Sequence, residues 1–413
     1  MPSNSLPKAL GHIRVLDLSR VLAGPWCSQN LADLGADVIK IERPEAGDDT
    51  RAWGPPYAKD AEGRDTTEAA YYLSANRGKR SVTVDIASAD GQALLHELAK
   101  QCDVVLENFK VGHLKRYGLD YDTLKAIKPD LVYCSVTGFG QDGPYAHRPG
   151  YDFLIQGMGG LMSITGERDD LPGGGPQKAG VAITDLMTGM YATVAVLAAL
   201  THRDRTGEGQ HIDMALLDVQ VAMLANMGSN YLNSGKAPKR WGNAHANIVP
   251  YQTFACADGY MIVATGNDGQ YQKFVEVGER ADLGADPRFA TNPLRVQNRD
   301  ILVPLLAEMC RTKTRDQWID QLEAAGVPCG PINDLHDVFE NPQVKARGVA
   351  IDMPHPTAGS VKLVRSPMKL SATPTAPERA PPLLGQHTDE VLRELLGHSD
   401  EQIAALKAKG VVS

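Results

Sequence analysis

The chain has few of the features that mark several large classes of protein. Its six cysteines are spread over 413 residues, and no two of them form a C-x-x-C pair. This spacing speaks against a cysteine-based zinc site and favours reduced thiols in a cytosolic-type protein. The 42 basic residues are outnumbered by 50 acidic ones, which gives a net charge of −8. Because there is no basic excess, neither nucleic acid nor an anionic membrane is favoured as a partner.

Long apolar segments are also scarce. The longest helical apolar run is expected near residues 190–200, which is far short of the roughly 20 residues that a membrane span needs. The first residues, MPSNSLPKALGH, contain no apolar core of the kind found in export signals. We therefore predict a cytoplasmic protein that does not associate with membranes.

Common motifs of metal sites, serine hydrolases and nucleoside-triphosphate sites are missing as well. Residues 138–143 match G-x-G-x-x-G, but Pro144 and Pro149 follow them, so no helix is expected to open there and face a pyrophosphate. We predict a glycine-rich loop at the end of a strand, with no bound dinucleotide and no metal.

Alternating strands and helices dominate the first 140 residues. Strands expected at 13–18 and 37–41 flank a helix at 24–34, which is a βαβ unit with parallel strands. The same alternation predicts a Rossmann-like α/β domain with helices on both faces of its sheet. Further strands are expected at 80–86, 103–106 and 131–136, and further helices at 89–100 and 121–128.

The remaining sequence predicts a second, smaller α/β domain. Two apolar helices, at 185–201 and 214–232, precede short strands at 251–254 and 260–264. We therefore predict four segments. They are the first part of a large Rossmann-like domain (1–205), a linker helix region (206–248), a small domain (249–332), and a return linker with the C-terminal part of the large domain (333–413).

Asp185 stands immediately ahead of the longest apolar helix and allows two interpretations. It can be an N-cap or first-turn acid, because acidic residues are common there. It can also be a carboxylate nucleophile, which must be ionised to react. The two roles are compatible, since the helix N-terminus favours the ionised form.

Polar and aromatic residues follow the expected strands. Asn108 and Phe109 come directly after one strand, Arg116 lies a few residues further on, and Arg43 follows another strand. An aromatic ring with amide and cationic neighbours suits an adenine nucleotide with phosphates, although a solvated polar loop has the same composition.

Several segments, in order along nearly the whole chain, resemble the class III CoA-transferases. They include residues 13–25 (IRVLDLSRVLAGP), 34–44 (LGADVIKIERP), 326–331 (GVPCGP) and 382–388 (PLLGQHT). Within that class, residues 47–56 (GDDTRAWGPP) and 239–245 (KRWGNAH) are most similar to dicarboxylate CoA-transferases of the succinyl-CoA:glutarate type.

The resemblance implies an interlocked homodimer with a Rossmann-like large domain and a small α/β domain. It implies CoA transfer from an acyl-CoA, succinyl-CoA by expectation, to a short dicarboxylate. The intermediates would be an aspartyl anhydride and an aspartyl-CoA thioester on Asp185, with CoA as substrate and no permanent cofactor. Implied CoA contacts are Val21, Ala23, Arg43, Val84, Asn108, Phe109 and Arg116. Substrate-side positions are Tyr151 and, for a distal carboxylate, Arg51, Arg77, Arg240 or His245.

Departures from the family pattern narrow the expected acceptor. Leu22 stands where some members have a glutamine, and residues 241–248 replace a glycine-run loop, so oxalate is disfavoured. Tyr151 stands where the related α-methylacyl-CoA racemases have a histidine, which favours transfer over racemisation. An acyl-CoA racemase and a non-catalytic CoA-binding protein remain the alternatives.

Overall fold

The computed structural model describes residues 7–375 and 378–413. Contacts within the chain divide it into two units. The first unit contains residues 1–161, 179–232 and 343–413, and the second contains 162–178 and 233–342. The four segments expected from the sequence, with bounds at residues 205, 248 and 332, stay a prediction.

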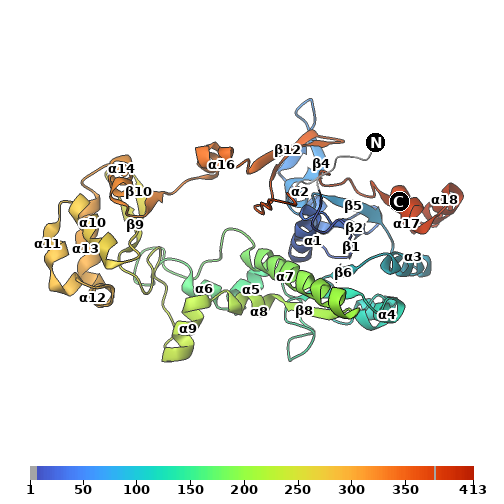
Figure 1. Ribbon diagram of the computed structural model, residues 1–413, viewed down its shortest axis with the longest axis horizontal. Coiled ribbons are helices and arrows are strands. Elements are labelled where there is room, and N and C mark those ends of the chain that lie inside the picture. Colours follow the sequence, from blue (N-terminus) through green and yellow to red (C-terminus); the bar gives the residue numbers. More distant parts are fainter. Residues whose placement is uncertain (1–6, 376–377) are drawn as a thin grey trace. The chain divides into compact units, whose positions relative to one another are not determined.

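A six-stranded parallel sheet forms the centre of the first unit (Figure 1). Every neighbouring pair of strands runs parallel, as the βαβ pattern predicts. In spatial order the strands are β5 (Lys79–Thr83), β2 (Asp37–Glu42), β1 (Arg14–Asp17), β6 (Val104–Glu107), β7 (Val132–Thr137) and β8 (His211–Ala215).

The two faces of this sheet are buried by different helices. Because side chains alternate along a strand, Val15 faces one apolar core and Leu16 the other. The Val15 side carries α1 (Ala23–Asp33) and α7 (Ile183–Thr206). The Leu16 side carries α3 (Ala89–Lys100), α4 (Tyr121–Ile127), α17 (Thr388–Leu396) and α18 (Asp400–Ala408).

Helix α7 has 24 residues and is longer than the expected helix at 185–201. By length and composition it is the one helix of the described residues that could cross a membrane. Its buried residues, among them Ala192, Val196 and Leu200, belong to the core that α1 and the sheet share. This packing is that of a core helix.

The outer edge of β5 is covered by a segment about 300 residues further along the chain. The backbone amide of His387 donates to the Ser81 carbonyl at 2.9 Å, and the amide of Ser81 donates to His387 Nδ1 at 3.2 Å. The amide of Thr83 donates to Thr388 Oγ1 at 3.1 Å. Residues 387–388 thereby occupy backbone groups that an edge strand would otherwise expose.

The other elements of the first unit are short. They comprise the antiparallel pair β3 (Tyr57–Lys59) and β4 (Asp65–Ala69), the antiparallel pair β12 (Ala350–His355) and β13 (Gly359–Val364), α2 (Ala70–Ser74), α5 (Asp152–Met158), α8 (Leu216–Ala222), α16 (Pro342–Ala346) and the 3₁₀ turns Asp49–Ala52 and Leu114–Tyr117. The chain passes between the units within α6 (Leu161–Ile164), α9 (Ala225–Ser234) and α16, and between residues 178 and 179.

The second unit packs helices on a three-stranded antiparallel sheet in the order β11 (Cys329–Pro331), β10 (Tyr260–Ala264), β9 (Tyr251–Ala255). Its core includes Phe254, Phe274 and Trp318. The helices are α10 (Asp268–Val277), α11 (Ala281–Ala285), α12 (Asn292–Gln297), α13 (Arg299–Cys310), α14 (Arg315–Ala325) and α15 (Leu335–Glu340), with a 3₁₀ turn at Pro287–Phe289.

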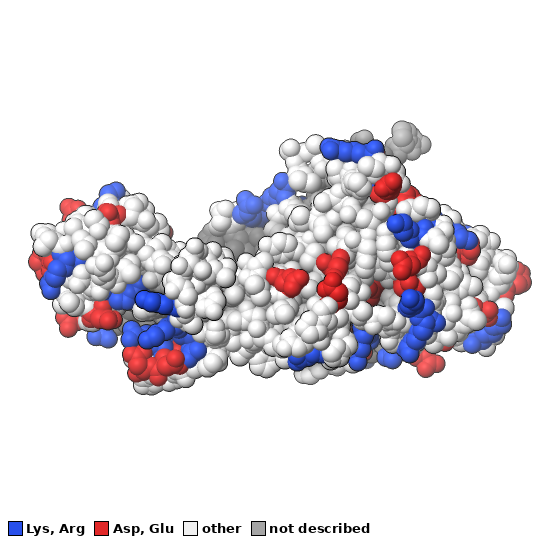
Figure 2. All heavy atoms as spheres, turned by 90° about the horizontal axis from the view of Figure 1, so that it is seen from below, with Lys and Arg blue, Asp and Glu red and all other residues white. Residues whose placement is uncertain are grey.

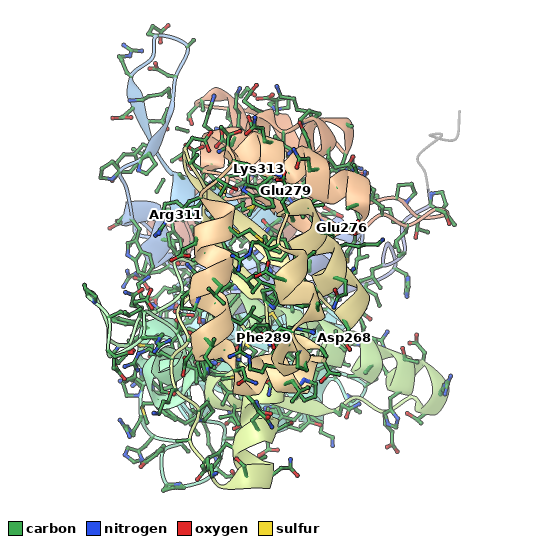
Figure 3. All side chains as sticks on the ribbon, turned by 90° about the vertical axis from the view of Figure 1, so that its left-hand side faces the viewer. Asp268, Glu276, Glu279, Phe289, Arg311 and Lys313 are labelled. Carbon is green, nitrogen blue, oxygen red and sulfur yellow. The ribbon has the colours of Figure 1, made fainter. Side chains whose placement is uncertain are left out.

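Two basic side chains, the half-buried Lys313 and the buried Arg295, tie the ends of these helices together. Figure 3 shows Lys313 and Glu279 at one end of the helix layer, and Phe289 and Asp268 at the other. Lys313 Nζ donates to the carbonyl of Val277 at 2.7 Å, near the C-terminus of α10. The fully buried Arg295 donates to Asp268 and to the carbonyl of Phe289.

One expected helix is wrong. The range 214–232 was expected as a single helix, but β8 continues to Ala215 and two helices, α8 and α9, follow it. Ala225 has a φ of 44°, a left-handed conformation that a continuous helix cannot contain.

On the face drawn in Figure 2, basic and acidic side chains lie in small mixed groups, as expected for a modest net charge.

Candidate active site

Two neighbouring cavities open at the carboxyl edge of the parallel sheet. From β1 the chain adds β2 and then β5 on one side, and it then crosses to β6 on the other side of β1. The strand order therefore reverses between β1 and β6, which is the switch point where such sheets bind ligands. The first cavity has a volume of about 320 Å³ and the second about 300 Å³. Arg20, Phe109 and His113 line both.

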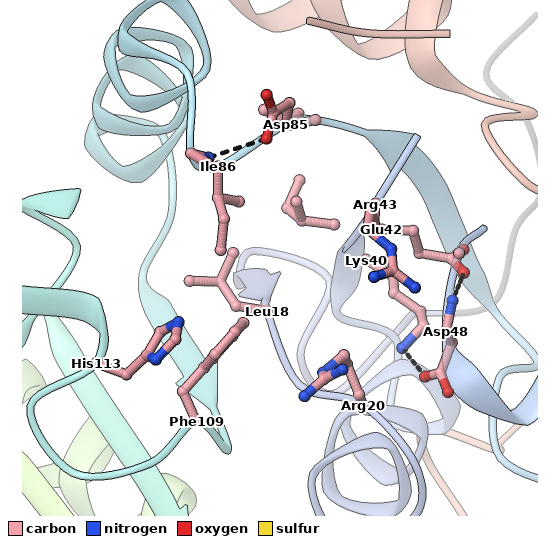
Figure 4. Close-up of a pocket in the computed structure, with 14 residues that line it drawn as sticks. Leu18, Arg20, Lys40, Glu42, Arg43, Asp48, Asp85, Ile86, Phe109 and His113 are labelled. Atoms are coloured by element: carbon pink, nitrogen blue, oxygen red, sulfur yellow. Dashed lines mark hydrogen bonds and ion pairs between the residues drawn. The ribbon is translucent and has the colours of Figure 1, made fainter. Parts of the chain in front are cut away.

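The first cavity combines apolar walls with two guanidinium groups (Figure 4). Phe109 and His113 lie on one side and Arg43 on the other. The rings of Phe109 and His113 stack at 5.4 Å, and the Arg20 guanidinium lies 5.4 Å from the Phe109 ring. Flat apolar surfaces suit a purine, and guanidinium groups suit phosphates. The predicted residues Arg43, Val84 and Phe109 meet here.

A buried ion pair supports the loop between the two cavities. Lys40 Nζ lies 2.8 Å from Asp48 Oδ2, and neither side chain is exposed. Lys40 Nζ also donates to the Ser19 carbonyl at 2.9 Å, and Asp48 accepts from the Val21 amide at 3.3 Å. Burial alone would raise the pKa of Asp48, but the Lys40 ammonium and hydrogen bonds from Lys40 and Thr50 lower it to about 2.

The same loop is held from the β6 side by Asn108. Its Oδ1 accepts from the Arg20 amide at 2.9 Å, and its Nδ2 donates to the Arg20 carbonyl at 2.6 Å. Glu107, the last residue of β6, accepts a hydrogen bond from the Phe109 amide at 2.7 Å. Val21 has a φ of 70°, which is unfavourable for a β-branched residue, so this backbone requires such outside support.

Asp185 lies in the second cavity, in the first turn of α7. Val21, Ala23, Asn108, Phe109 and Tyr151 line the same cavity. Asp185 is 9% exposed, and among the described residues no hydrogen-bond donor is recorded for its carboxylate. The sequence allowed Asp185 to be either the N-cap or an acid in the first turn. It is an acid in the first turn, since the N-cap is Ala182.

Asp152 provides the cap that Ala182 cannot. From the start of α5, its Oδ2 accepts from the backbone amides of Thr184 at 2.8 Å and Asp185 at 3.3 Å. Burial, and then the nearby charge of Asp152, raise the pKa of Asp185 to about 7. The helix N-terminus was expected to favour the ionised form of Asp185. Burial of the carboxylate and the charge of Asp152, which already accepts from the amides of that turn, outweigh this effect.

Four other predicted cations do not line these cavities. Arg51 lies in a buried cluster, where it donates to Glu42 at 2.7 Å and to the Tyr72 hydroxyl at 2.6 Å. Arg77 is buried against Asp33. Arg116 is exposed and contacts the His113 ring at 2.7 Å. Arg240 belongs to the second unit and is paired with Asp169.

The prediction that Arg51 or Arg77 holds a distal carboxylate is not supported by these contacts, because their guanidinium groups already bind carboxylates inside the protein. His245 also belongs to the second unit, where its Nδ1 accepts from the Asn247 amide at 3.0 Å. Sequence reasoning missed the roles of Asp48, Lys40 and Asp152, although residues 47–56 had been singled out. It also missed Arg148, which lines the second cavity.

The site therefore combines a desolvated carboxylate with a neighbouring cavity whose aromatic and guanidinium groups suit a nucleotide. The profile of CoA-transferase family III matches residues 10–388. The chain belongs to this family, and it is an enzyme that transfers CoA between CoA thioesters and carboxylates.

Several known proteins are similar to this chain over almost its whole length. The chain is 50% identical over 396 residues to the succinate–glutarate CoA-transferase of Agrobacterium fabrum, covering 96% of this chain and 97% of that protein. It is 44% identical to the human succinyl-CoA:glutarate CoA-transferase, covering 98% and 90%. A CAIB/BAIF family protein from Brucella suis has the same fold, with a TM-score of 0.82, 51% identity and coverage of 95% and 100%.

Proposed function

We propose that this enzyme transfers CoA from succinyl-CoA to glutarate or a similar short dicarboxylate, with Asp185 as the nucleophile. The observation that carries the proposal is the position of the Asp185 carboxylate, desolvated and free of hydrogen-bond donors among the described residues, in the cavity at the sheet's switch point. A carboxylate without donors is a stronger nucleophile than a hydrogen-bonded one. The names of two relatives supply the donor and the acceptor.

The reaction proceeds in four balanced steps on one carboxylate. Asp185 attacks the thioester carbonyl of succinyl-CoA, forming a mixed anhydride and releasing CoA thiolate. The thiolate attacks the Asp185 carbonyl carbon, which gives an enzyme–CoA thioester and frees succinate. Glutarate attacks that thioester and releases the thiolate again. The thiolate then attacks the glutaryl carbonyl, which gives glutaryl-CoA and restores the Asp185 carboxylate.

The CoA moiety is proposed to lie across both cavities. Arg43, Val84 and Phe109 contact its nucleotide end in the first cavity, and Val21, Ala23 and Asn108 line its path toward Asp185. Arg116, which is exposed beside His113, is proposed to contact a phosphate of CoA from outside the cavity. Tyr151 is 68% exposed and stays on the substrate side.

We also propose an interlocked homodimer with a Rossmann-like large domain and a small domain. Helix α7 exposes the apolar side chains of Tyr191 and Val194, and Val181, two residues ahead of the helix, is exposed as well. Large exposed apolar groups close together favour a protein partner. A cytoplasmic location is supported by six free cysteines.

An acceptor screen tests the reaction. Wild type and Asp185→Asn are incubated with succinyl-CoA and a panel of carboxylates, and new acyl-CoA is detected by mass spectrometry. Asp204→Asn is the matched control, because Asp204 is an exposed acid on the last turn of the same helix. Glutaryl-CoA from wild type and the control, but not from Asp185→Asn, is the expected result.

The opposite results are equally clear. Transfer by Asp185→Asn at the wild-type rate excludes the nucleophile. No transfer to any carboxylate by wild type excludes the proposed acceptor class, and exchange of an α-proton of the acyl-CoA in deuterated water then identifies a racemase.

A further inference from the structure

Arg148 is one of two cations in the second cavity, with Lys110, that have no carboxylate partner among the residues the structure describes. It lies in the loop between β7 and α5 and lines the same cavity as Asp185 and Tyr151. Among residues 7–375 and 378–413, no carboxylate is within 4.0 Å of its guanidinium, and its recorded side-chain polar contact is with the Met158 sulfur at 4.0 Å. Arg20, in the same cavity, is paired with Asp49 at 2.9 Å.

Two aromatic rings hold the guanidinium of Arg148 in place. It lies 4.6 Å from the ring of Tyr145 and 5.2 Å from the ring of Phe139. The two rings contact each other edge to face at 5.7 Å. Stacking on aromatic faces orients a guanidinium while its N–H edge stays available for a planar, two-oxygen acceptor.

The loop that carries Arg148 has its two ends in contact with each other. A Cβ added at Gly138 would lie 2.6 Å from the Gly150 Cα, so these two glycines bring the loop ends into direct contact. The loop is also tied to β8, because the Gln141 amide donates to Asp213 at 2.9 Å. Arg148 therefore extends from a loop with fixed ends and not from a free surface segment.

The chemistry of a dicarboxylate calls for a cation at this place. When one carboxyl group is at Asp185, the second is repelled by the charges of Asp185 and Asp152 unless a cation offsets them. Lys110, which also lines the cavity and has no carboxylate partner within the described ranges, is exposed and carries a flexible point charge. Arg148 is half-buried and already oriented.

We propose that Arg148 binds the distal carboxylate of the succinyl donor and of the dicarboxylate acceptor, and so makes the enzyme selective for diacids. This inference rests on the proposed function and adds to it the residue that reads the second carboxyl group. It replaces the internally paired Arg51 and Arg77 as the selectivity residue.

The test compares two acceptors that differ only in the second carboxyl group. Wild type, Arg148→Gln and Arg148→Lys are assayed with succinyl-CoA and either glutarate or pentanoate. A hydrogen-bonded charge pair of ordinary strength corresponds to about a 10- to 100-fold rise in KM for glutarate in Arg148→Gln. The kcat/KM of Arg148→Gln for pentanoate is expected to stay within a few-fold of wild type. The KM of Arg148→Lys for glutarate is expected to lie between those of wild type and Arg148→Gln.

Two controls separate other roles of Arg148. The Kd of free CoA, measured by calorimetry, is expected to be unchanged in Arg148→Gln, whereas a phosphate-binding role would weaken it. Arg393→Gln removes an exposed, paired arginine far along the chain and is expected to behave as wild type. If Arg148→Gln folds poorly, the ratio of glutarate to pentanoate activity in Arg148→Lys still reports the loss of the planar fork.

The donor half-reaction is common to both assays and does not enter kcat/KM for the acceptor in a ping-pong reaction. The inference is overturned if kcat/KM falls by the same factor for glutarate and pentanoate, if neither value changes, or if CoA binding weakens instead. In each of these cases wild type still makes glutaryl-CoA and the proposed function stands. If wild type makes pentanoyl-CoA but no glutaryl-CoA, the proposed function and this inference both fail.

Discussion

The buried carboxylate of Asp185 makes the folded enzyme less stable at neutral pH than it would be with a neutral group. Asp185 has an ordinary pKa of 3.8 in the unfolded chain and about 7 in the folded one. A raised acid pKa means that the folded state loses stability as pH rises from about 4 to about 7, because the unfolded chain ionises first. Asp185→Asn has no such titration and tests this directly.

The size of the effect follows from the two pKa values. At pH 8 the ionised Asp185 costs the folded state about 4 kcal/mol, and at pH 5 the same linkage costs about 2 kcal/mol. The stabilisation by Asp185→Asn should therefore be larger at pH 8 than at pH 5 by about 2 to 3 kcal/mol. With an unfolding entropy of about 2.1 cal/mol/K per residue, this difference is about 3 °C in Tm for a chain of this length.

Thermal unfolding of the ligand-free protein at pH 5, 6, 7 and 8 measures the difference. Asp204→Asn serves as the control and should follow wild type at every pH, since its side chain is 58% exposed. Parallel curves for Asp185→Asn and wild type would refute the reasoning, because they would mean that Asp185 ionises as easily in the folded protein as in the unfolded chain.

Two further predictions concern residues that act on the site from outside it. Asp152→Asn removes the neighbouring charge that helps to raise the pKa of Asp185, so the acid limb of a pH profile of kcat/KM should move to lower pH; an unmoved limb would exclude this coupling. Asp48→Asn leaves the ammonium of Lys40 buried and unpaired, which should destabilise the protein by about 3 to 5 kcal/mol in denaturant unfolding. The double variant Lys40→Met/Asp48→Leu should recover stability but keep a raised KM for succinyl-CoA, because the Ser19 carbonyl and Val21 amide still lack their partners; a normal KM would refute the positioning role.

The sequence predicts those parts of the site that depend on local order. Parallel strands bring their carboxyl ends to one edge, so Asn108 after β6 and Val21 after β1 could be expected to meet. Whether a cation is free depends instead on distant partners. Arg51 is neutralised by Glu42 and donates a hydrogen bond to the Tyr72 hydroxyl through tertiary contacts, whereas Arg148 has no carboxylate beside it among the described residues.

Local pattern also failed where tertiary contacts override it. The apolar stretch at 214–232 has helical composition, but the first residues pair with β7 as a strand. The pKa of Asp185 could not be predicted from its place at a helix N-terminus, because Asp152, 33 residues earlier, already occupies the amides of that turn. Family resemblance predicts Asp185 as the nucleophile, which stays a prediction, whereas its raised pKa is explained by burial and by the neighbouring Asp152 in the fold.

The cover of β5 by residues 387–388 has a consequence for synthesis on the ribosome. Thr83 and His387 are 304 residues apart in sequence, so at roughly 5 to 20 residues per second the strand emerges about 15 to 60 s before its cover. During that interval the nascent sheet has an open edge that can pair with other chains. The first unit is therefore expected to depend on chaperones until translation passes α18, and truncations before residue 387 should yield insoluble protein.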